Sequence, residues 1–338
     1  MILLSYIKEV LENNEPRFIE HLAQHAQTTT RQYFGRAMSI YAPLYLANYC
    51  DNYCLYCGFQ HDRPVARKKL DGPEMRAEME KIAAMGIRNI LLLTGESRTK
   101  TPVSYIKEAV LQASQYFPSI SLEIYPLEEA EYRELFLAGV DGVTVYQETY
   151  DKERYKFLHP KGKKADYDYR YATPERIARS GIRAISLGVL LGLSETAADI
   201  FNLFNHLQWL EKNYPGVEYS LSFPRIIPIT PSPLDYVQVS DLMLIKLICL
   251  ARILFPRVGI NLSTREQGTF RDHAVMLGVT KISAASKTNV GGYSSGDAKD
   301  PQFEVMDSRS VVEITDMLKQ KGLDPVFTDW RHITNEMI

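Results

Sequence analysis

Three of the four cysteines lie within eight residues, in the run 50-CDNYCLYC-57. Thiolates bind soft metals and metal clusters, so Cys50, Cys54 and Cys57 are the residues whose type and spacing most clearly predict chemistry. The remaining cysteine, Cys249, lies far along the chain in an apolar helical segment. We expect it to be a small buried hydrophobic residue rather than a fourth ligand.

Several kinds of site contain clustered thiols. Disulfide pairing is a poor explanation, because the number is odd and the chain is not cysteine-rich. Structural zinc is an alternative, but it usually takes four ligands, and after His61 no residue continues a ligand pattern. An electron-transfer cluster would need a fourth cysteine, which only Cys249 could supply. The other reading is an iron–sulfur cluster with three protein ligands and one iron left open for chemistry.

The rest of the chain alternates between strand-like apolar runs and helix-like segments, after a helical stretch over 5–30. Several helical segments have an early Asp, Ser or Thr and end at Gly. Eight alternating units predict a parallel sheet closed into a (β/α)8 barrel, with a doubly wound open sheet as the alternative. The strand candidates are 43–48, 89–94, 120–126, 142–147, 184–191, 218–224, 259–263 and 281–284. We expect a helical extension over 1–35, the barrel over 36–305, and a C-terminal helix and tail over 306–338 that pack on it.

Composition excludes several classes of function. With 45% hydrophobic and 24% charged residues the chain is typical of globular proteins, and its net charge of −2 offers no basic field for nucleic acid. No apolar run approaches about 18 residues, so no membrane span is expected. No signal peptide is recognised at the N-terminus, and the cysteine content indicates a reducing compartment, so we expect a cytoplasmic location.

The cysteine loop follows the first strand candidate, which places it at the face where barrel enzymes build their active sites. Its pattern, Cys-x3-Cys-x-Tyr-Cys, resembles the signature of the radical S-adenosylmethionine (radical SAM) superfamily. The resemblance implies a [4Fe–4S] cluster on Cys50, Cys54 and Cys57, with S-adenosylmethionine (SAM) as the ligand of the fourth iron. Such enzymes reductively cleave SAM to a 5′-deoxyadenosyl radical, and the protein positions and tunes the cofactors.

Further motifs resemble the SAM-binding elements of that superfamily. The resemblance implies that 94-TGE-96 receives the methionine ammonium through its backbone and Glu96. It also places Glu148 and Arg170 at the cofactor, where a guanidinium can clamp the methionine carboxylate in a bidentate manner. The strand 188-GVLLGLSE-195 resembles one that flanks adenine. The expected cofactor contacts are therefore Tyr56, Thr94, Gly95, Glu96, Glu148, Arg170, Gly192 and Leu193.

Segments spread over nearly the whole chain are similar to the aromatic amino-acid lyase branch of the superfamily. This resemblance implies cleavage of the Cα–Cβ bond of L-tyrosine to 2-iminoacetate (dehydroglycine) and p-cresol, with 5′-deoxyadenosine and methionine as further products, for thiazole formation in thiamine biosynthesis. The alternatives are a tryptophan lyase of indolic-acid antibiotic pathways and a non-catalytic iron–sulfur or zinc module. The similar segments are 43-PLYLANYCDNYCLYCGF-59, 91-LLLTGE-96, 144-TVYQETY-150, 158-LHPKGKKADYDYR-170, 263-STRE-266, 286-SKTNVGGY-293 and 323-LDPVFTDW-330.

The same resemblance assigns three residues to the substrate. Arg265 is expected to bind the substrate carboxylate, Ser283 to support it with a hydroxyl, and Tyr45 to line the pocket near the amino group. No residue is assigned to the phenol, or to discrimination between tyrosine and tryptophan. The expected partners are the amino-acid substrate, a one-electron reductant of flavodoxin or ferredoxin type, and thiazole synthase as acceptor of the imine.

Overall fold

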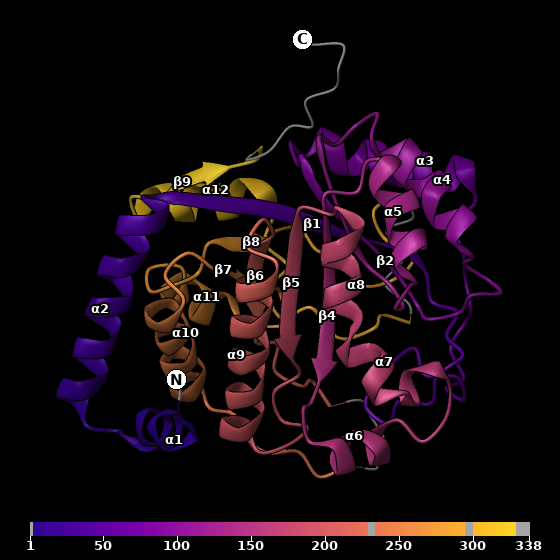
Figure 1. Ribbon diagram of the computed structural model, residues 1–338. Coiled ribbons are helices and arrows are strands. Elements are labelled where there is room, and N and C mark those ends of the chain that lie inside the picture. The colour runs from indigo at the N-terminus through magenta and orange to yellow at the C-terminus, as the bar shows by residue number, and fades with distance from the viewer. Residues whose placement is uncertain (1–2, 229–233, 295–299, 329–338) are drawn as a thin grey trace.

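In the computed structural model, residues 3–228, 234–294 and 300–328 are described, and eight parallel strands close into a ring (Figure 1). Each strand pairs with the next along the chain, and β8 and β2 both pair with β1, which closes the ring. The (β/α)8 barrel is thus confirmed over the open sheet. Its strands are β1 (Ala37–Ala47), β2 (Asn89–Thr94), β3 (Ser119–Glu123), β4 (Gly142–Glu148), β5 (Ala184–Val189), β6 (Glu218–Ser222), β7 (Gly259–Leu262) and β8 (Lys281–Ser283).

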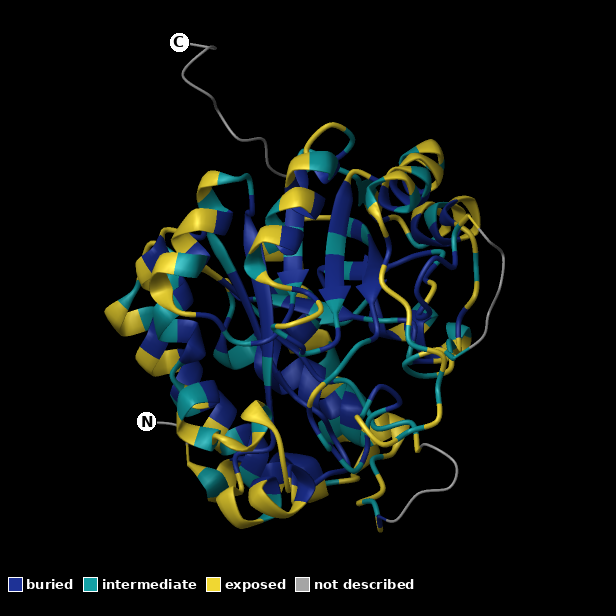
Figure 2. Ribbon diagram, turned by 90° about the vertical axis from the view of Figure 1, so that its right-hand side faces the viewer, coloured by how far each residue is buried: buried dark blue, intermediate teal, exposed yellow. Residues whose placement is uncertain are grey.

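Helices surround the barrel and leave its strands buried, as the dark centre of Figure 2 shows. The main covering helices are α3 (Gly72–Ala84), α4 (Val103–Ala113), α5 (Glu129–Leu137), α8 (Thr173–Ser180), α9 (Thr196–Asn213), α10 (Asp241–Leu254) and α11 (Gly268–Ala274). The short α6 (Lys152–Leu158), η1 (Lys163–Ala165) and α7 (Tyr167–Tyr171) lie between β4 and α8. In Figure 1, α6 and α7 lie at the end toward which the arrow of β4 points. None of the described helices is long and apolar enough to cross a membrane.

Local sequence signals account for several helix starts. Asp71 accepts a hydrogen bond from the Glu74 amide, and the Glu74 carboxylate accepts one from the Asp71 amide, which forms a capping box at the start of α3. Ser240 caps α10 through the Met243 amide. These caps fix where each crossover helix begins, and hence the length of the loop between each strand and its helix.

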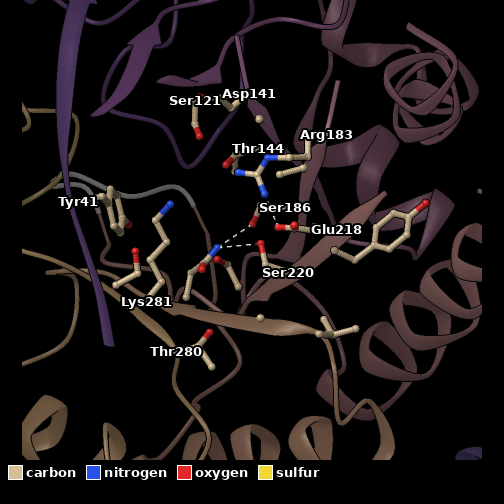
Figure 3. A pocket seen from close by; sticks show the side chains of 18 of the residues that line it. Tyr41, Ser121, Asp141, Thr144, Arg183, Ser186, Glu218, Ser220, Thr280 and Lys281 are labelled. Atoms are coloured by element: carbon tan, nitrogen blue, oxygen red, sulfur yellow. Dashed lines mark hydrogen bonds and ion pairs between the residues drawn. The ribbon is translucent and has the colours of Figure 1, made fainter. Parts of the chain in front are cut away.

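The strand residues that face the barrel interior are unusually polar. Barrel interiors are normally filled by branched apolar side chains, yet Ser121, Ser186, Ser220 and Asn261 line a cavity of about 740 Å³ here. The Asn261 amide donates hydrogen bonds to the hydroxyls of Ser186 at 3.0 Å and Ser220 at 3.1 Å (Figure 3). The cavity includes the first residues of many strands, so it opens at the end of the barrel opposite the cysteine loop.

The N-terminal helical stretch is two helices rather than one. Helix α1 (Leu4–Glu12) ends before Pro16, which starts α2 (Pro16–Phe34), because proline is tolerated in a first helical turn and not in a helix interior. The buried Lys246 of α10 donates hydrogen bonds to the carbonyl of Leu11, in the last turn of α1, and to that of Asn13, which follows α1. This buried ammonium ties the extension to the barrel.

A ninth strand was not expected. Strand β9 (Asp324–Val326) follows α12 (Val311–Gln320) and pairs in parallel with the start of β1, with Ala37 opposite Asp324. Strand β1 therefore begins at Ala37, earlier than the run 43–48 indicated. The division of the chain at 35 and 305 stays a prediction, and the end of the expected tail, 329–338, lies outside the described residues.

The fully buried Arg252 of α10 links backbone segments at the end of the barrel where β7 and β8 begin. Its guanidinium donates hydrogen bonds to the carbonyls of Pro256 at 3.0 Å, Val258 at 2.8 Å and Gly278 at 2.8 Å. It also lies 4.5 Å from the ring centre of Phe34 at the end of α2. One side chain thus donates hydrogen bonds to carbonyls that precede and follow β7 in the sequence, and it also contacts the N-terminal extension.

We predict that Arg252→Ala lowers the free energy of unfolding by about 3 kcal/mol or more, because it leaves several buried carbonyls without donors. The exposed Arg179→Ala on α8 is the matched control and should change it by about 0.5 kcal/mol or less. Urea unfolding followed by circular dichroism measures both variants. Equal midpoints for the two would show that the Arg252 contacts add no stability.

Candidate active site

The three clustered cysteines lie in the loop that leaves β1. Cys54 is buried, and Cys50 and Cys57 are half-buried. The amide of Asp51 donates to the carbonyl of Glu96 at 3.0 Å, and that of Leu55 donates to Leu158 at 3.1 Å, so the loop is held against its neighbours by the backbone.

Burial keeps the three thiols protonated when no metal is bound. It raises the pKa of Cys50 to about 11, with the charge of Glu96 as the next cause, and it raises the pKa of Cys54 and of Cys57 as well. Thiolate ligation in this loop therefore releases protons.

Two glycines allow other segments to approach the cysteine loop closely. A Cβ atom on Gly95 would lie 2.2 Å from the carbonyl oxygen of Tyr49, and one on Gly162 would lie 2.3 Å from Oδ1 of Asn52. Gly162 also has φ = 99°, which favours glycine. The end of β2 and the loop before η1 can therefore lie directly against the cysteine loop only because these residues have no side chain.

Four charged side chains converge behind this loop. Nη1 of Arg170 lies 3.0 Å from Oε1 of Glu96, and Nζ of Lys164 lies 2.7 Å from Oε1 of Glu148. The pairs are cross-linked, since Arg170 Nη2 lies 3.6 Å from Glu148 and Lys164 lies 3.8 Å from Glu96. Asn52, in the cysteine loop, donates to Glu96 at 2.7 Å and accepts from the Lys164 amide at 2.9 Å. The sequence-predicted residues Glu96, Glu148 and Arg170 are thus brought together.

The two carboxylates of this cluster stay ionised although they are buried. Burial alone would raise the pKa of Glu96, but the charges of Arg170 and Lys164 outweigh it and lower that pKa. Glu148 is lowered in the same way, with Lys164 and then Arg170 opposing the effect of burial. Glu148 also has φ = 70°, a conformation that non-glycine residues rarely adopt and that clusters at functional sites.

The end of β2 carries an unsatisfied polar atom that fits a bound ammonium group. The buried Oγ1 of Thr94 has no hydrogen-bond partner among the described residues, and the ionised Glu96 lies two residues further on. A hydroxyl oxygen and a carboxylate are suitable acceptors for an ammonium group such as that of SAM. The hydrogen-bond acceptors at this position therefore fit the cofactor that the sequence resemblance implies.

The thiol positions suit a cluster better than a single ion. In the described part of the chain, no three His, Cys, Asp or Glu side chains are arranged to hold one metal ion. In a [4Fe–4S] cluster each thiolate binds a different iron, so its ligands do not converge on one point. The donor chemistry, three soft thiols in an enclosed loop, fits such a cluster.

An apolar group surrounds the far side of the cysteine loop. Tyr56, Leu193 and Cys54 are buried in one small cluster of side chains. The Tyr56 hydroxyl lies 2.8 Å from Nε2 of His159, whose pKa burial holds well below its usual value, so a neutral imidazole accepts this hydrogen bond. Gly192 has φ = 104°, and a Cβ there would lie 2.5 Å from Ile226. The roles of Tyr56, Gly192 and Leu193 at adenine stay predictions.

The three predicted substrate residues lie around the same mouth of the barrel. Tyr45, on β1, is buried, and its hydroxyl donates to Oε1 of Gln302 at 2.7 Å. The guanidinium of Arg265, just after β7, lies 3.6 Å from the ring centre of Phe303 and makes no ion pair with any described residue. This free cation acts electrostatically on Tyr45, whose pKa is raised mainly by burial and lowered by Arg265.

Ser283 lies deeper in the barrel than Tyr45. It is opposite Tyr41 in the β1–β8 register, and Tyr41 lies four residues before Tyr45 on β1. Its hydroxyl is buried beside Tyr41 without a well-formed hydrogen bond among the described residues. Its predicted part in substrate binding is not tested by these contacts.

Two residues of the site were not singled out from the sequence. Lys164 lies in a basic, glycine-broken loop that resembles many solvated loops, and only the fold brings it to Glu148. Glu123 ends β3 and lies within the strand candidate 120–126. The signal that could have identified it is an acidic residue inside an apolar run, 119-SISLEIY-125. Arg225, which follows β6, forms ion pairs with the buried Glu266 and with Asp241. Its positive charge is therefore compensated without a ligand.

Comparison with known proteins agrees with this geometry. The model of the radical SAM superfamily matches residues 44–207, and that of the biotin and thiamin synthesis associated domain matches residues 222–324. The 2-iminoacetate synthase of Salmonella typhimurium is 40% identical over 93% of this chain and 83% of its own length. The Escherichia coli enzyme of the same name is 41% identical over the same shares.

Solved structures lead to the same group. HydG, a maturase of the [FeFe]-hydrogenase, superposes with a TM-score of 0.90 at 31% identity, over 97% of this chain and 73% of that one. Methylornithine synthase has a TM-score of 0.79 at 18% identity, over 96% and 94%, and shares the fold. With its three-cysteine loop, its barrel and these relatives, the chain belongs to the radical SAM superfamily and, within it, to the 2-iminoacetate synthase family.

Proposed function

We propose that this protein cleaves the Cα–Cβ bond of L-tyrosine to give 2-iminoacetate and p-cresol, for thiazole formation in thiamine biosynthesis. The observation that carries the proposal is the 40% identity to a 2-iminoacetate synthase over 93% of the chain. The alternative is a tryptophan lyase, which would use the same cofactors. Turnover measured with tyrosine and with tryptophan distinguishes the two activities.

The cofactors of the family are a [4Fe–4S] cluster and SAM. In our proposal Cys50, Cys54 and Cys57 bind three irons and leave the fourth for SAM. When both cofactors are bound, they supply the 5′-deoxyadenosyl radical that starts the reaction. The loop buries Cys54 and leaves Cys50 and Cys57 half-buried, and the protonated thiols would contribute no competing charge until iron binds.

The charged cluster holds the amino-acid end of SAM in this proposal. Thr94 and Glu96 offer side-chain acceptors to the ammonium, and the backbone at Gly95 lies between them. Arg170 already donates to Glu96 and to the carbonyl of Tyr146, so it positions these acceptors and reaches a carboxylate only with its remaining N–H groups. Lys164 adds a second positive charge at the same place.

The substrate lies across the barrel mouth in this proposal. Arg265 binds its carboxylate, since an unpaired guanidinium at an enclosed site requires an anion. Tyr45 and the deeper Ser283 line the pocket beside it. These contacts hold the amino group near the reacting carbon of the cofactor, and holding reactants in near-attack geometry lowers the barrier without any acid or base.

The reaction also defines the partners that we propose. Reductive cleavage of SAM requires an external one-electron reductant of flavodoxin or ferredoxin type. The imine product hydrolyses readily in water, so direct uptake by thiazole synthase would protect it. Co-purification of the two proteins, and a longer lifetime of the imine when thiazole synthase is present, are the expected observations.

We predict that Cys54→Ala abolishes the cluster, because two thiolates and an alanine cannot hold its three ligated irons. Iron and acid-labile sulfide should fall from about four of each per chain to a small fraction, and 5′-deoxyadenosine formation should stop. The matched control is Cys249→Ala, which removes a buried thiol from α10, away from the loop. A full cluster in Cys54→Ala would contradict the ligand assignment.

We predict that Arg265→Ala keeps the cluster and SAM binding but lowers kcat/KM for tyrosine by about 100-fold, the value of a charge-assisted bidentate contact. Arg265→Lys should be intermediate, because lysine keeps the charge and loses the fork. Arg179→Ala, on the exposed face of α8, is the control. p-Cresol is measured by chromatography, and an unaltered yield from Arg265→Ala would refute the clamp.

A further inference from the structure

Strand β3 directs one acidic side chain into the barrel mouth. Side chains alternate along a strand, and Ser119 and Ser121 of β3 line the interior cavity. Glu123, two residues further, therefore also faces the interior, while the buried Leu122 faces the helices. In the register, Tyr45, Leu93 and Glu123 lie side by side on β1, β2 and β3. Glu123 thus belongs to the same layer as a predicted substrate residue.

The Glu123 carboxylate has no hydrogen bond or ion pair with any described residue, although the residue is half-buried. Burial, and next the charge of Glu148, raise its pKa to about 7, while Arg265, Lys164 and Arg170 lower it. An acidic side chain without a partner inside a barrel is costly for stability. Such a cost is commonly kept where the group contacts a ligand.

Among the acidic and phenolic groups that face Glu123, none is another unpaired carboxylate in the described part of the chain. Glu148 is already paired with Lys164 and Arg170. The hydroxyls of the neighbouring tyrosines remain protonated at neutral pH, because burial raises the pKa of each. These tyrosines are Tyr41, Tyr45 and Tyr146.

Glu123 lies across the barrel mouth from Arg265, the residue proposed to bind the substrate carboxylate. In a ring of eight strands, β3 and β7 are four strands apart and lie on opposite walls. Glu123 ends β3, and Arg265 follows β7 by three residues. A substrate whose carboxylate binds Arg265 therefore extends its ring across the mouth, toward Glu123.

We propose that Glu123 accepts the hydrogen bond of the substrate's phenolic hydroxyl and selects amino acids with a para-hydroxylated ring. This inference rests on the proposed tyrosine lyase activity and names the residue that reads the phenol. Sites that pair a substrate hydroxyl discriminate strongly against the analogue that lacks it, because the buried acceptor is then left unpaired.

The test compares tyrosine and phenylalanine binding to the SAM-loaded holoenzyme, by anaerobic isothermal titration calorimetry. We expect the wild type to prefer tyrosine, and Glu123→Leu to weaken tyrosine binding by about 10- to 100-fold without weakening phenylalanine binding. Glu123→Gln should retain part of the preference, since an amide oxygen also accepts. Glu218→Gln, at the exposed start of β6 on the other end of the barrel, is the control and should change neither affinity.

The pH dependence gives a second readout. The ionised carboxylate is the better acceptor, so tyrosine affinity should rise as the pH increases through about 7 in the wild type. This rise should be absent in Glu123→Gln, and phenylalanine affinity should not follow it. At pH 8 the Glu123 carboxylate is ionised, and its raised pKa means that this ionised form destabilises the folded state. A neutral glutamine side chain at this position removes that cost, so the melting temperature of Glu123→Gln should be no lower than that of the wild type, which checks that the variant folds.

The outcomes separate this inference from the proposed function. A wild type that cleaves tyrosine, together with an unchanged tyrosine affinity in Glu123→Leu, would overturn the role of Glu123 alone. Equal losses for tyrosine and phenylalanine would also overturn it, because a structural role predicts no selectivity. A wild type that fails to bind or cleave tyrosine would overturn both.

Discussion

The paired charges of Glu96, Arg170, Glu148 and Lys164 are the constraint on which the site depends. Two buried carboxylates would repel each other and accept protons, and two buried cations would be equally costly. Here each carboxylate lies beside both cations, so the opposite charges compensate one another. These ion pairs also join the ends of β2 and β4 to η1 and α7. Asn52 then couples the cysteine loop to this arrangement. The cysteine loop and the residues that we propose as acceptors for SAM are therefore held in a fixed relation to each other.

The interior of this barrel is more polar than that of a typical (β/α)8 barrel. Its interior layers carry serine, asparagine and tyrosine where branched apolar residues are usual, so the packing that stabilises the fold lies between the strands and the helices. Stability is supplemented at the periphery, by Arg252 beneath β7 and by Lys246 at the N-terminal extension. The polar interior continues along β3 from Ser119 and Ser121 to Glu123, whose carboxylate has no partner among the described residues.

Much of this arrangement could be predicted from the sequence, because its signals are local. The cysteine spacing identified the loop. The alternation of strands and helices placed this loop at the same face of the barrel as the ends of β2 and β4, near which Glu96 and Glu148 lie. What sequence patterns could not reveal depends on the fold. Lys164 reaches Glu148 only through the bend at Gly162, and the side of β3 that faces the interior shows only once the barrel closes. β9 is three residues long, with no periodic pattern to announce it.

Anaerobic turnover with tyrosine and tryptophan in separate reactions tests the central claim most directly. The enzyme is supplied with a reconstituted cluster, SAM and dithionite, and the products are separated by chromatography. The account predicts p-cresol and glyoxylate, the hydrolysed imine, from tyrosine, and no product from tryptophan. Product from tryptophan alone would leave the barrel, the cluster and the SAM site in place, and would contradict the tyrosine lyase.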